Sequence, residues 1–105
     1  MERCCEMKGF LRFIVLKLIE KRNMSGEEIR QEIKKRRGTK PSPGTIYPVL
    51  KSLSENALIE EVSRIGKTKR YMLTKKGKED IEIATKKFCE IFYDIKDEFS
   101  RCKYQ

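Results

Sequence analysis

The segment from Ser42 to Ile59, SPGTIYPVLKSLSENALI, constrains the fold more than any other part of this 105-residue chain. Its apolar residues recur at the helical spacing i, i+3, i+4 and i+7, which places them on one stripe facing a core: Ile46, Val49, Leu50 and Leu53. The other face carries Gly44, Tyr47, Pro48, Lys51 and Ser52. Such a helix suits insertion into a DNA groove, and an ordinary surface helix is the alternative.

The sequence also indicates where this helix begins and ends. Ser42 is expected to be the N-cap with Pro43 at the first helical position, and Asn56 is expected to end the helix in the left-handed conformation. Pro48 in the helix interior would cost roughly 3 kcal/mol because it removes a backbone hydrogen bond. A cap shifted to Gly44 or Thr45 would remove most of that cost, since Pro48 would then lie close to the helix start.

Positive charge is concentrated in the middle of the chain. The sequence holds 25 Lys and Arg against 16 Asp and Glu, and the segment from Lys34 to Lys78 alone holds 13 basic and 3 acidic residues. A basic block between near-neutral segments is typical of a surface that contacts a phosphate backbone. A solvated charged face that binds nothing is the alternative.

Two more helices are predicted before this segment. The first covers Met7 to Arg22, and eight of the ten residues from Phe10 to Ile19 are apolar, which is wider than one stripe. It therefore has a face for the core and a second face for a partner subunit or the C-terminal helix. The second begins at the capping-box pattern Ser25 to Glu28 and runs to about Arg37. The short linker 38–41 predicts a steep angle to the next helix, the helix-turn-helix arrangement.

A β-hairpin is predicted after Asn56. Residues 58–64 and 69–74 flank a turn near Gly66, and the second run alternates in polarity. The hairpin would display the basic residues Arg64, Lys67, Lys69 and Arg70 beside the third helix. Exposed strand lysines can also serve to prevent edge-to-edge aggregation, which is the alternative.

A long final helix is predicted from Lys75 to about Lys103. Six apolar residues follow 3-4 spacing, and Phe92 and Phe99 lie one residue beside them: Ile81, Ala84, Phe88, Ile91, Ile95 and Cys102. At about 42 Å the helix exceeds the width of so small a domain. Dimerisation is therefore favoured over folding back onto the first helix. The expected interface is Phe10, Phe13, Leu16, Ile81, Ala84, Phe88, Ile91, Phe92, Ile95 and Phe99. We expect a mainly α chain with a small β-hairpin: a winged helix-turn-helix DNA-binding domain over 1–78 and a dimerisation helix over 79–105.

Little in the sequence points to catalysis. The chain has no histidine, and its cysteines at 4, 5, 89 and 102 lack metal-ligand spacing, so no metal, cofactor or enzyme activity is expected. Inert buried thiols are favoured over a redox switch through Cys89 or Cys102. The ten-residue apolar run is too short to span a bilayer, and a cytoplasmic protein is expected.

Three motifs resemble one family in the same order. Gly44-Thr45-Ile46-Tyr47-Pro48-Val49-Leu50-x-x-Leu53 resembles the G-T-[LI]-Y-P-x-L-x-x-L core of the PadR-like transcriptional regulators. Leu58-Ile59 resembles the end of their G-L-I turn, and the segment 69–77 resembles R-x-Y-x-L-T-x-x-G. The chain departs from the pattern at Ala57, where the family has glycine and Asn56 is expected to take over the turn. It also lacks the tyrosine after Gly26 and any tryptophan.

The resemblance implies a homodimeric transcription factor, usually a repressor, whose third helix enters the major groove while the wing contacts the flanking backbone. The expected partner is double-stranded DNA with a palindromic operator, and a small-molecule effector is left unidentified. A winged-helix module for RNA or a protein is the alternative. Lys51 is the expected guanine reader. The expected DNA contacts are Lys40, Ser42, Gly44, Thr45, Tyr47, Lys51, Ser52, Arg64, Lys67, Lys69 and Arg70.

Overall fold

The computed structural model describes the backbone of residues 3–99 and the side chains of residues 9–63 and 66–98. Within these residues the elements follow in the order α1 (Arg3–Lys21), β1 (Met24–Ser25), α2 (Gly26–Arg37), α3 (Pro43–Glu55), β2 (Ile59–Ile65), β3 (Thr68–Leu73), α4 (Lys75–Asp94) and α5 (Lys96–Phe99). The expected fold class, mainly α with a small β-element, is confirmed.

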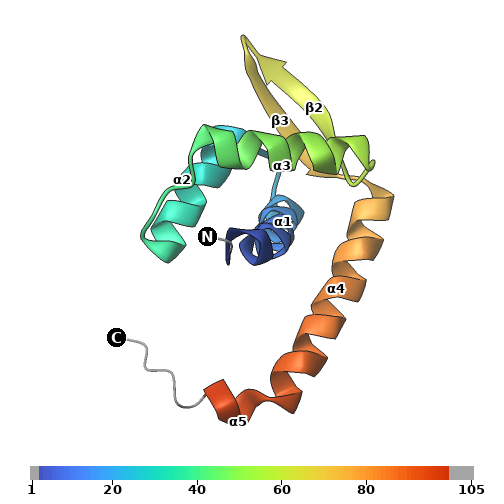
Figure 1. The fold of residues 1–105 in the computed structure, drawn as a ribbon. Coiled ribbons are helices and arrows are strands. Elements are labelled where there is room, and N and C mark those ends of the chain that lie inside the picture. Colours follow the sequence, from blue (N-terminus) through green and yellow to red (C-terminus); the bar gives the residue numbers. More distant parts are fainter. Residues whose placement is uncertain (1–2, 100–105) are drawn as a thin grey trace.

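Helix α1 lies at the centre, with α3 crossing it, α2 beside it and the β2–β3 hairpin projecting past α3 (Figure 1). The core is made of aliphatic side chains from every one of these elements and the start of α4: Val15, Leu18, Ile19, Ile29, Ile33, Ile46, Leu50, Leu53, Leu58, Ile59, Leu73 and Ile81. The predicted stripe of α3 is confirmed, since Ile46, Leu50 and Leu53 are buried and Val49 packs partly buried against them.

The sheet has one strand more than the hairpin predicted from the sequence. Its order is β1-β3-β2, and all pairings are antiparallel. Strand β1 is only two residues long, Met24 opposite Tyr71 and Ser25 opposite Arg70, so it left no alternating pattern to detect. The hairpin turn holds Gly66 at φ 62°, a conformation that favours glycine.

The N-terminus of α3 lies where the sequence predicted it. Ser42 is the N-cap and Pro43 occupies the first turn. The cap does not shift to Gly44 or Thr45, which would have left Pro48 near the helix start. Pro48 therefore lies inside the helix. The first turn is supported instead by the Thr45 and Ile46 amides, which both donate to the Ser42 carbonyl at 3.0 Å.

The C-terminus of α3 corrects the expectation for Asn56. Asn56 has φ −89°, and the left-handed residue is Ala57 at φ 62°. The Leu58 amide donates to the Leu53 carbonyl and the Ala57 amide to the Ser54 carbonyl, both at 3.0 Å, which is the Schellman pattern of helix ends. Asn56 is the C-cap, and its side chain donates to the Ser52 carbonyl at 2.8 Å. The turn therefore falls on alanine.

Helix α4 is shorter than the single helix predicted to Lys103. It begins after Thr74, whose Oγ1 accepts a hydrogen bond from the Gly77 amide at 3.0 Å, and it ends at Asp94. Ile95, at φ −115°, separates it from the one-turn α5. Residues Cys102 and Lys103 lie outside the described residues. The expected domain boundary after Lys78 falls inside α4, and its division of the chain stays a prediction.

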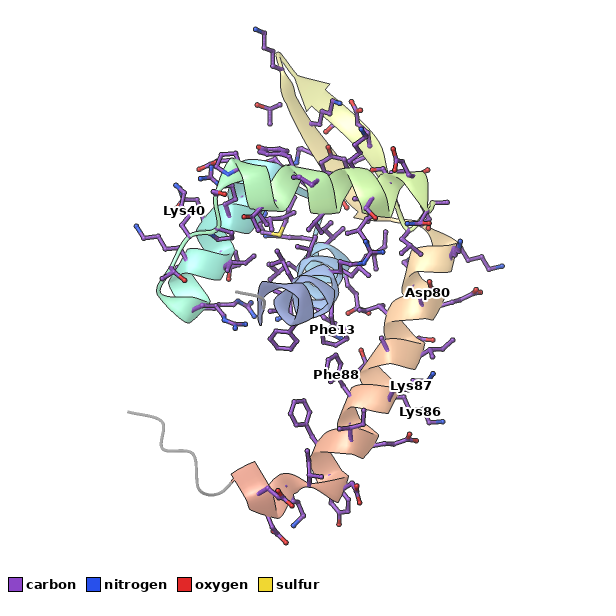
Figure 2. The ribbon with its side chains drawn as sticks, viewed as in Figure 1. Phe13, Lys40, Asp80, Lys86, Lys87 and Phe88 are labelled. Atoms are coloured by element: carbon purple, nitrogen blue, oxygen red, sulfur yellow. The ribbon has the colours of Figure 1, made fainter. Side chains whose placement is uncertain are left out.

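Helix α4 packs on α1 of the same chain as far along as Phe88. The ring centroid of Phe88 lies 4.5 Å from that of Phe13 and 6.0 Å from that of Phe10, and Figure 2 shows Phe13 and Phe88 facing each other. The end of α4 beyond Phe88 extends away from the other elements (Figure 1), which agrees with overall dimensions of 48 × 28 × 25 Å. One end of α4 thus belongs to the protomer core and the other does not.

Candidate nucleic-acid interface

The outward face of α3 carries part of the predicted DNA surface. Gly44, Tyr47 and Lys51 are exposed there, because the 3.6-residue period that buries Ile46 and Leu50 turns these positions outward. Thr45 is also exposed, at the start of the helix and on the side of Ser52. Ser42 is also exposed, and its hydroxyl lies 3.1 Å from that of Thr45. This face presents hydroxyls, an aromatic ring and an ammonium group along one helix.

Tyr47 is positioned by the first residue of α2. A β-carbon placed on Gly26 would lie 2.6 Å from Cε1 of the Tyr47 ring, so glycine is what lets the ring approach this helix. Tyr47 remains 45% exposed. The ring is therefore held against α2 on one side and open to solvent on the other, an arrangement that the sequence analysis missed.

Ser52 does not face outward as predicted. It is half-buried, and its Oγ accepts a hydrogen bond from Nη1 of Arg12 at 2.7 Å. We therefore leave Ser52 out of the candidate interface, because its hydroxyl is bonded within the protein. The reason lies in the helix position: Ser52 is three residues after Val49 and turns toward α1 with it.

The turn before α3 is fixed by charged residues of α2. Lys40 is exposed, and its Nζ lies 3.3 Å from Oε2 of Glu27. Arg30 also pairs with Glu27, and its Nε donates to the Pro41 carbonyl at 2.8 Å. Hydrogen bonds from Gln31 first, and then from Lys40, lower the pKa of Glu27. Lys40 thus stands at the start of α3 with its ammonium group already near one carboxylate.

The wing presents two of its four predicted cations. Lys67 and Lys69 are exposed at and beside the turn. The side chain of Arg64 lies outside the described residues, and its backbone pairs with Lys69. A register shift between Glu61 and Ser63 interrupts the ladder further down β2.

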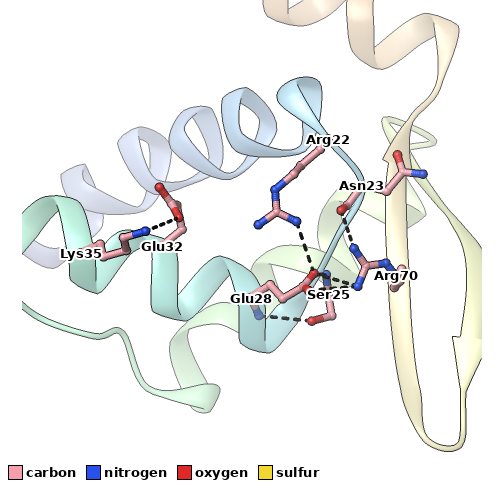
Figure 3. A network of polar contacts seen from close by, with 7 residues as sticks. All are labelled: Arg22, Asn23, Ser25, Glu28, Glu32, Lys35 and Arg70. Carbon is pink, nitrogen blue, oxygen red and sulfur yellow. Dashed lines mark hydrogen bonds and ion pairs between the residues drawn. The ribbon is translucent and has the colours of Figure 1, made fainter.

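Arg70 corrects the prediction for the fourth cation. Its Nη1 lies 3.0 Å from both carboxylate oxygens of Glu28, and its Nη2 donates to the Asn23 carbonyl at 2.9 Å (Figure 3). We therefore remove Arg70 from the candidate interface, because its guanidinium is committed to contacts within the protein. It ties β3 to the loop before β1 and to the start of α2.

Glu28 belongs to a capping box that the sequence predicted. The Ser25 amide donates to Glu28 Oε1 at 3.0 Å, and the Glu28 amide donates to Ser25 Oγ at 3.2 Å. These bonds satisfy amides that a helix start would leave free. The bond from the Ser25 amide, reinforced by Arg70, lowers the pKa of Glu28.

The residues predicted to form a dimer interface do not share one environment. Leu16 and Ile81 are buried in the protomer core, so the prediction is wrong for them. Phe10, Phe13 and Phe88 contact one another within the chain, as in the alternative of α4 folding back. The remaining described positions are half-buried, at Ala84 and Ile95, or exposed, at Ile91 and Phe92. The side chain of Phe99 lies outside the described residues.

Other kinds of site have little support in the described part of the chain. No three of its Cys, Asp or Glu side chains gather as a metal site would require, and none of its helices is long and apolar enough to cross a membrane. Cys89 is a free thiol and is exposed, so the expectation of a buried thiol is wrong there. Cys4, Cys5 and Cys102 lie outside the described side chains.

Comparison with known proteins gives a consistent result. Residues 15–83 match the transcriptional regulator PadR-like family. An uncharacterised protein of Lysinibacillus sphaericus is 33% identical over 91 residues, covering 81% of this chain and 84% of its own. A PadR-like transcriptional regulator of Bacillus cereus has a TM-score of 0.79 at 26% identity, over 89% of this chain and 94% of that one.

A further similar structure is that of Bacillus subtilis PadR in complex with operator DNA. It has a TM-score of 0.66 at 28% identity, over 72% of this chain and 46% of the other. The winged-helix fold predicted from the order of elements is therefore confirmed.

Proposed function

Because this chain belongs to the transcriptional regulator PadR-like family, as its three motifs predicted, we propose that it binds a palindromic operator in duplex DNA as a homodimer and represses transcription. One observation carries the proposal: the exposed face of α3 holds Thr45, Tyr47 and Lys51, and the wing beside it ends in Lys67 and Lys69. The relative from Bacillus subtilis, crystallised with operator DNA, supports this assignment. The protein acts in the cytoplasm, where it meets the chromosome.

Helix α3 enters the major groove. A helix with hydroxyl, phenol and ammonium groups on one side can contact base edges, and Lys51 is the residue that reads a guanine. Ser42, Gly44 and Thr45 lie at the exposed start of the helix, whose positive dipole end suits contact with a phosphate. Lys40, Lys67 and Lys69 bind the flanking phosphates, with Arg64 as a further candidate. Affinity then falls with salt, with a log-log slope of roughly −0.9 per neutralised phosphate.

The second half of α4 supports the homodimer. Phe88 and Phe92 stack with their ring centroids 5.7 Å apart, and Ile91, Phe92 and Tyr93 stay exposed at 56%, 44% and 75%. Exposed large apolar side chains gathered on one helix segment mark an interaction surface. A second copy that covers it places two α3 helices on successive major grooves, about 34 Å apart.

Repression follows from occupancy of the operator. A dimer seated across two successive grooves excludes other proteins from the same DNA face. The direction of control is tested by placing the chain's own upstream region before a reporter gene. Expression of the protein lowers reporter output if it represses, and raised output would contradict this part of the proposal.

DNA binding itself is tested by fluorescence anisotropy on fragments of the upstream region, with DNase footprinting on the best fragment. We expect tight binding at low salt, a two-fold symmetric footprint and loss of affinity as salt rises. Equal affinity for every duplex would contradict operator recognition. Preference for single-stranded RNA over duplex DNA would replace the proposal with an RNA-binding function.

A further inference from the structure

A cavity of about 720 Å³ opens between α1, the end of α2, the turn 38–42 and α3. Its volume lies within the roughly 300–1,000 Å³ range of small-molecule sites. The walls are mostly hydrocarbon, and they are formed by Phe10, Leu11, Ile14, Ile33, Pro48 and Val49. A ligand for this cavity therefore has a largely apolar body.

Three cations also line the cavity: Arg12, Arg37 and Lys40. Among the described lining residues none is acidic. Lys40 already pairs with Glu27, whereas Arg12 donates to the neutral hydroxyl of Ser52 at 2.7 Å. The guanidinium of Arg37 lies 5.4 Å from the ring centroid of Phe10. Charge complementarity calls for an anionic head group on the apolar body.

The side chains of the apolar wall restrict the class of ligand further. Phe10 is the one aromatic residue among the described lining residues, and Arg37 covers one face of its ring. Phe10 also contacts Phe88 in a T-shaped arrangement. Little aromatic surface is therefore open for an aromatic ligand to stack on. The leucine, isoleucine and valine side chains of the wall suit a flexible hydrocarbon chain in the ligand.

We propose that this cavity binds a linear aliphatic carboxylate and that binding lowers affinity for DNA. The effect on DNA rests on the function proposed above. Gly44 and Thr45 line the cavity and also belong to the proposed DNA surface, as does Lys40. A carboxylate near Arg12 competes with Ser52 for the guanidinium, loosening the contact between α1 and α3. It also reduces the positive potential that attracts phosphates.

Direct binding is measured by calorimetry with sodium octanoate and with 1-octanol, which has the same chain without the charge. Arg37→Gln is compared with Arg36→Gln, because the two arginines are neighbours and Arg36 pairs with Glu32 outside the cavity. We expect octanoate to bind the original chain and Arg36→Gln alike. Arg37→Gln and the use of octanol should each weaken binding about tenfold, the loss expected for a charge-assisted hydrogen bond.

Equal binding of octanoate and octanol, equal effects of the two substitutions, or no binding at all would overturn the proposal. Sedimentation with and without octanoate adds a further check. If octanoate dissociates a dimer, the cavity holds part of a second copy, and the ligand assignment is wrong.

The link to DNA is measured separately, by anisotropy with octanoate against the same concentration of sodium acetate. Acetate controls for ionic strength, which weakens DNA binding by itself. A larger loss with octanoate, absent in Arg37→Gln, supports the link, and equal loss with both salts overturns it. If octanoate binds as expected while no duplex binds at any salt, the ligand site stands and the proposed function falls.

Discussion

Nη1 of Arg70 lies 3.0 Å from both carboxylate oxygens of Glu28, and 42 residues separate the two in the chain. The pair joins strand β3 to the capping box of α2. It also engages the guanidinium of a wing cation in contacts within the protein. Its neighbour Lys69, one residue earlier on the same strand, is exposed.

The Arg70–Glu28 pair makes the free energy of unfolding depend on pH. The Ser25 amide and Arg70 lower the pKa of Glu28 below 4.5, so the stabilisation is present above pH 4.5 and is lost as pH falls through the lower value in the folded protein. Glu28→Gln keeps an acceptor for Ser25 but loses the ion pair. Urea unfolding should show a loss of about 0.5–1 kcal/mol at pH 7, since the pair is only partly shielded from solvent.

The same measurement at pH 3 provides the control. At pH 3 the free energies of unfolding of Glu28→Gln and the original chain should differ less, because Glu28 is becoming protonated. Glu27 and Glu32, whose pKa values are also lowered, are present in both proteins and cancel. A difference that stays constant from pH 7 to pH 3 would show that the charge of Glu28 does not contribute.

Lys51 and Lys67 should differ in what they contribute to DNA binding. Lys51→Ala is expected to reduce discrimination at one base pair of each half-site by about 1–3 kcal/mol, because it removes a contact to a base edge. Lys67→Ala should weaken all sequences alike and reduce the salt slope by about 1. Anisotropy titrations on operator variants over a salt series separate the two. A uniform effect from both substitutions would contradict the assignment of Lys51 as the reader.

Ala57→Gly should stabilise the protein. An L-residue in the left-handed conformation costs roughly 1–2 kcal/mol, whereas the extra freedom of glycine in the unfolded chain costs about 0.4–1 kcal/mol. Ala57 is exposed at φ 62°, so little packing is lost and a net gain of about 0.5–1 kcal/mol is expected. The matched control is Ala84→Gly inside α4, which should instead destabilise by about 1 kcal/mol. Urea titrations in which both substitutions destabilise would refute this account of the turn.

Ile91→Asp should dissociate the proposed dimer. A carboxylate buried without a partner in an apolar interface costs several kcal/mol, so the dissociation constant should rise at least about a hundredfold. Lys86→Asp on the same helix is the control, since Lys86 points away from Phe88 (Figure 2). Sedimentation equilibrium gives the mass of each variant. If Ile91→Asp and the original chain have the same mass at every concentration, this face of α4 is not where the subunits meet.

The sequence alone determined the helical segments, the buried stripe of α3, the capping box at Ser25 and the hairpin around Gly66. These features depend on residue spacing within one element, so periodicity and turn residues reveal them. The order of elements and three local motifs were then enough to identify the family. The end of the last helix was predicted less well, since Ile95 interrupts it without a proline or glycine to signal the break.

Only the tertiary structure decided which polar side chains face inward. Arg12 meets Ser52 across 40 residues, and Arg70 meets Glu28 across 42, so no local pattern distinguishes these residues from exposed cations and hydroxyls. The same holds for Leu16 and Ile81, which fit an interface stripe but are buried by the packing of α1, α3 and α4. Periodicity tells which side of a helix is apolar, and the partner that covers it depends on where distant elements come to lie.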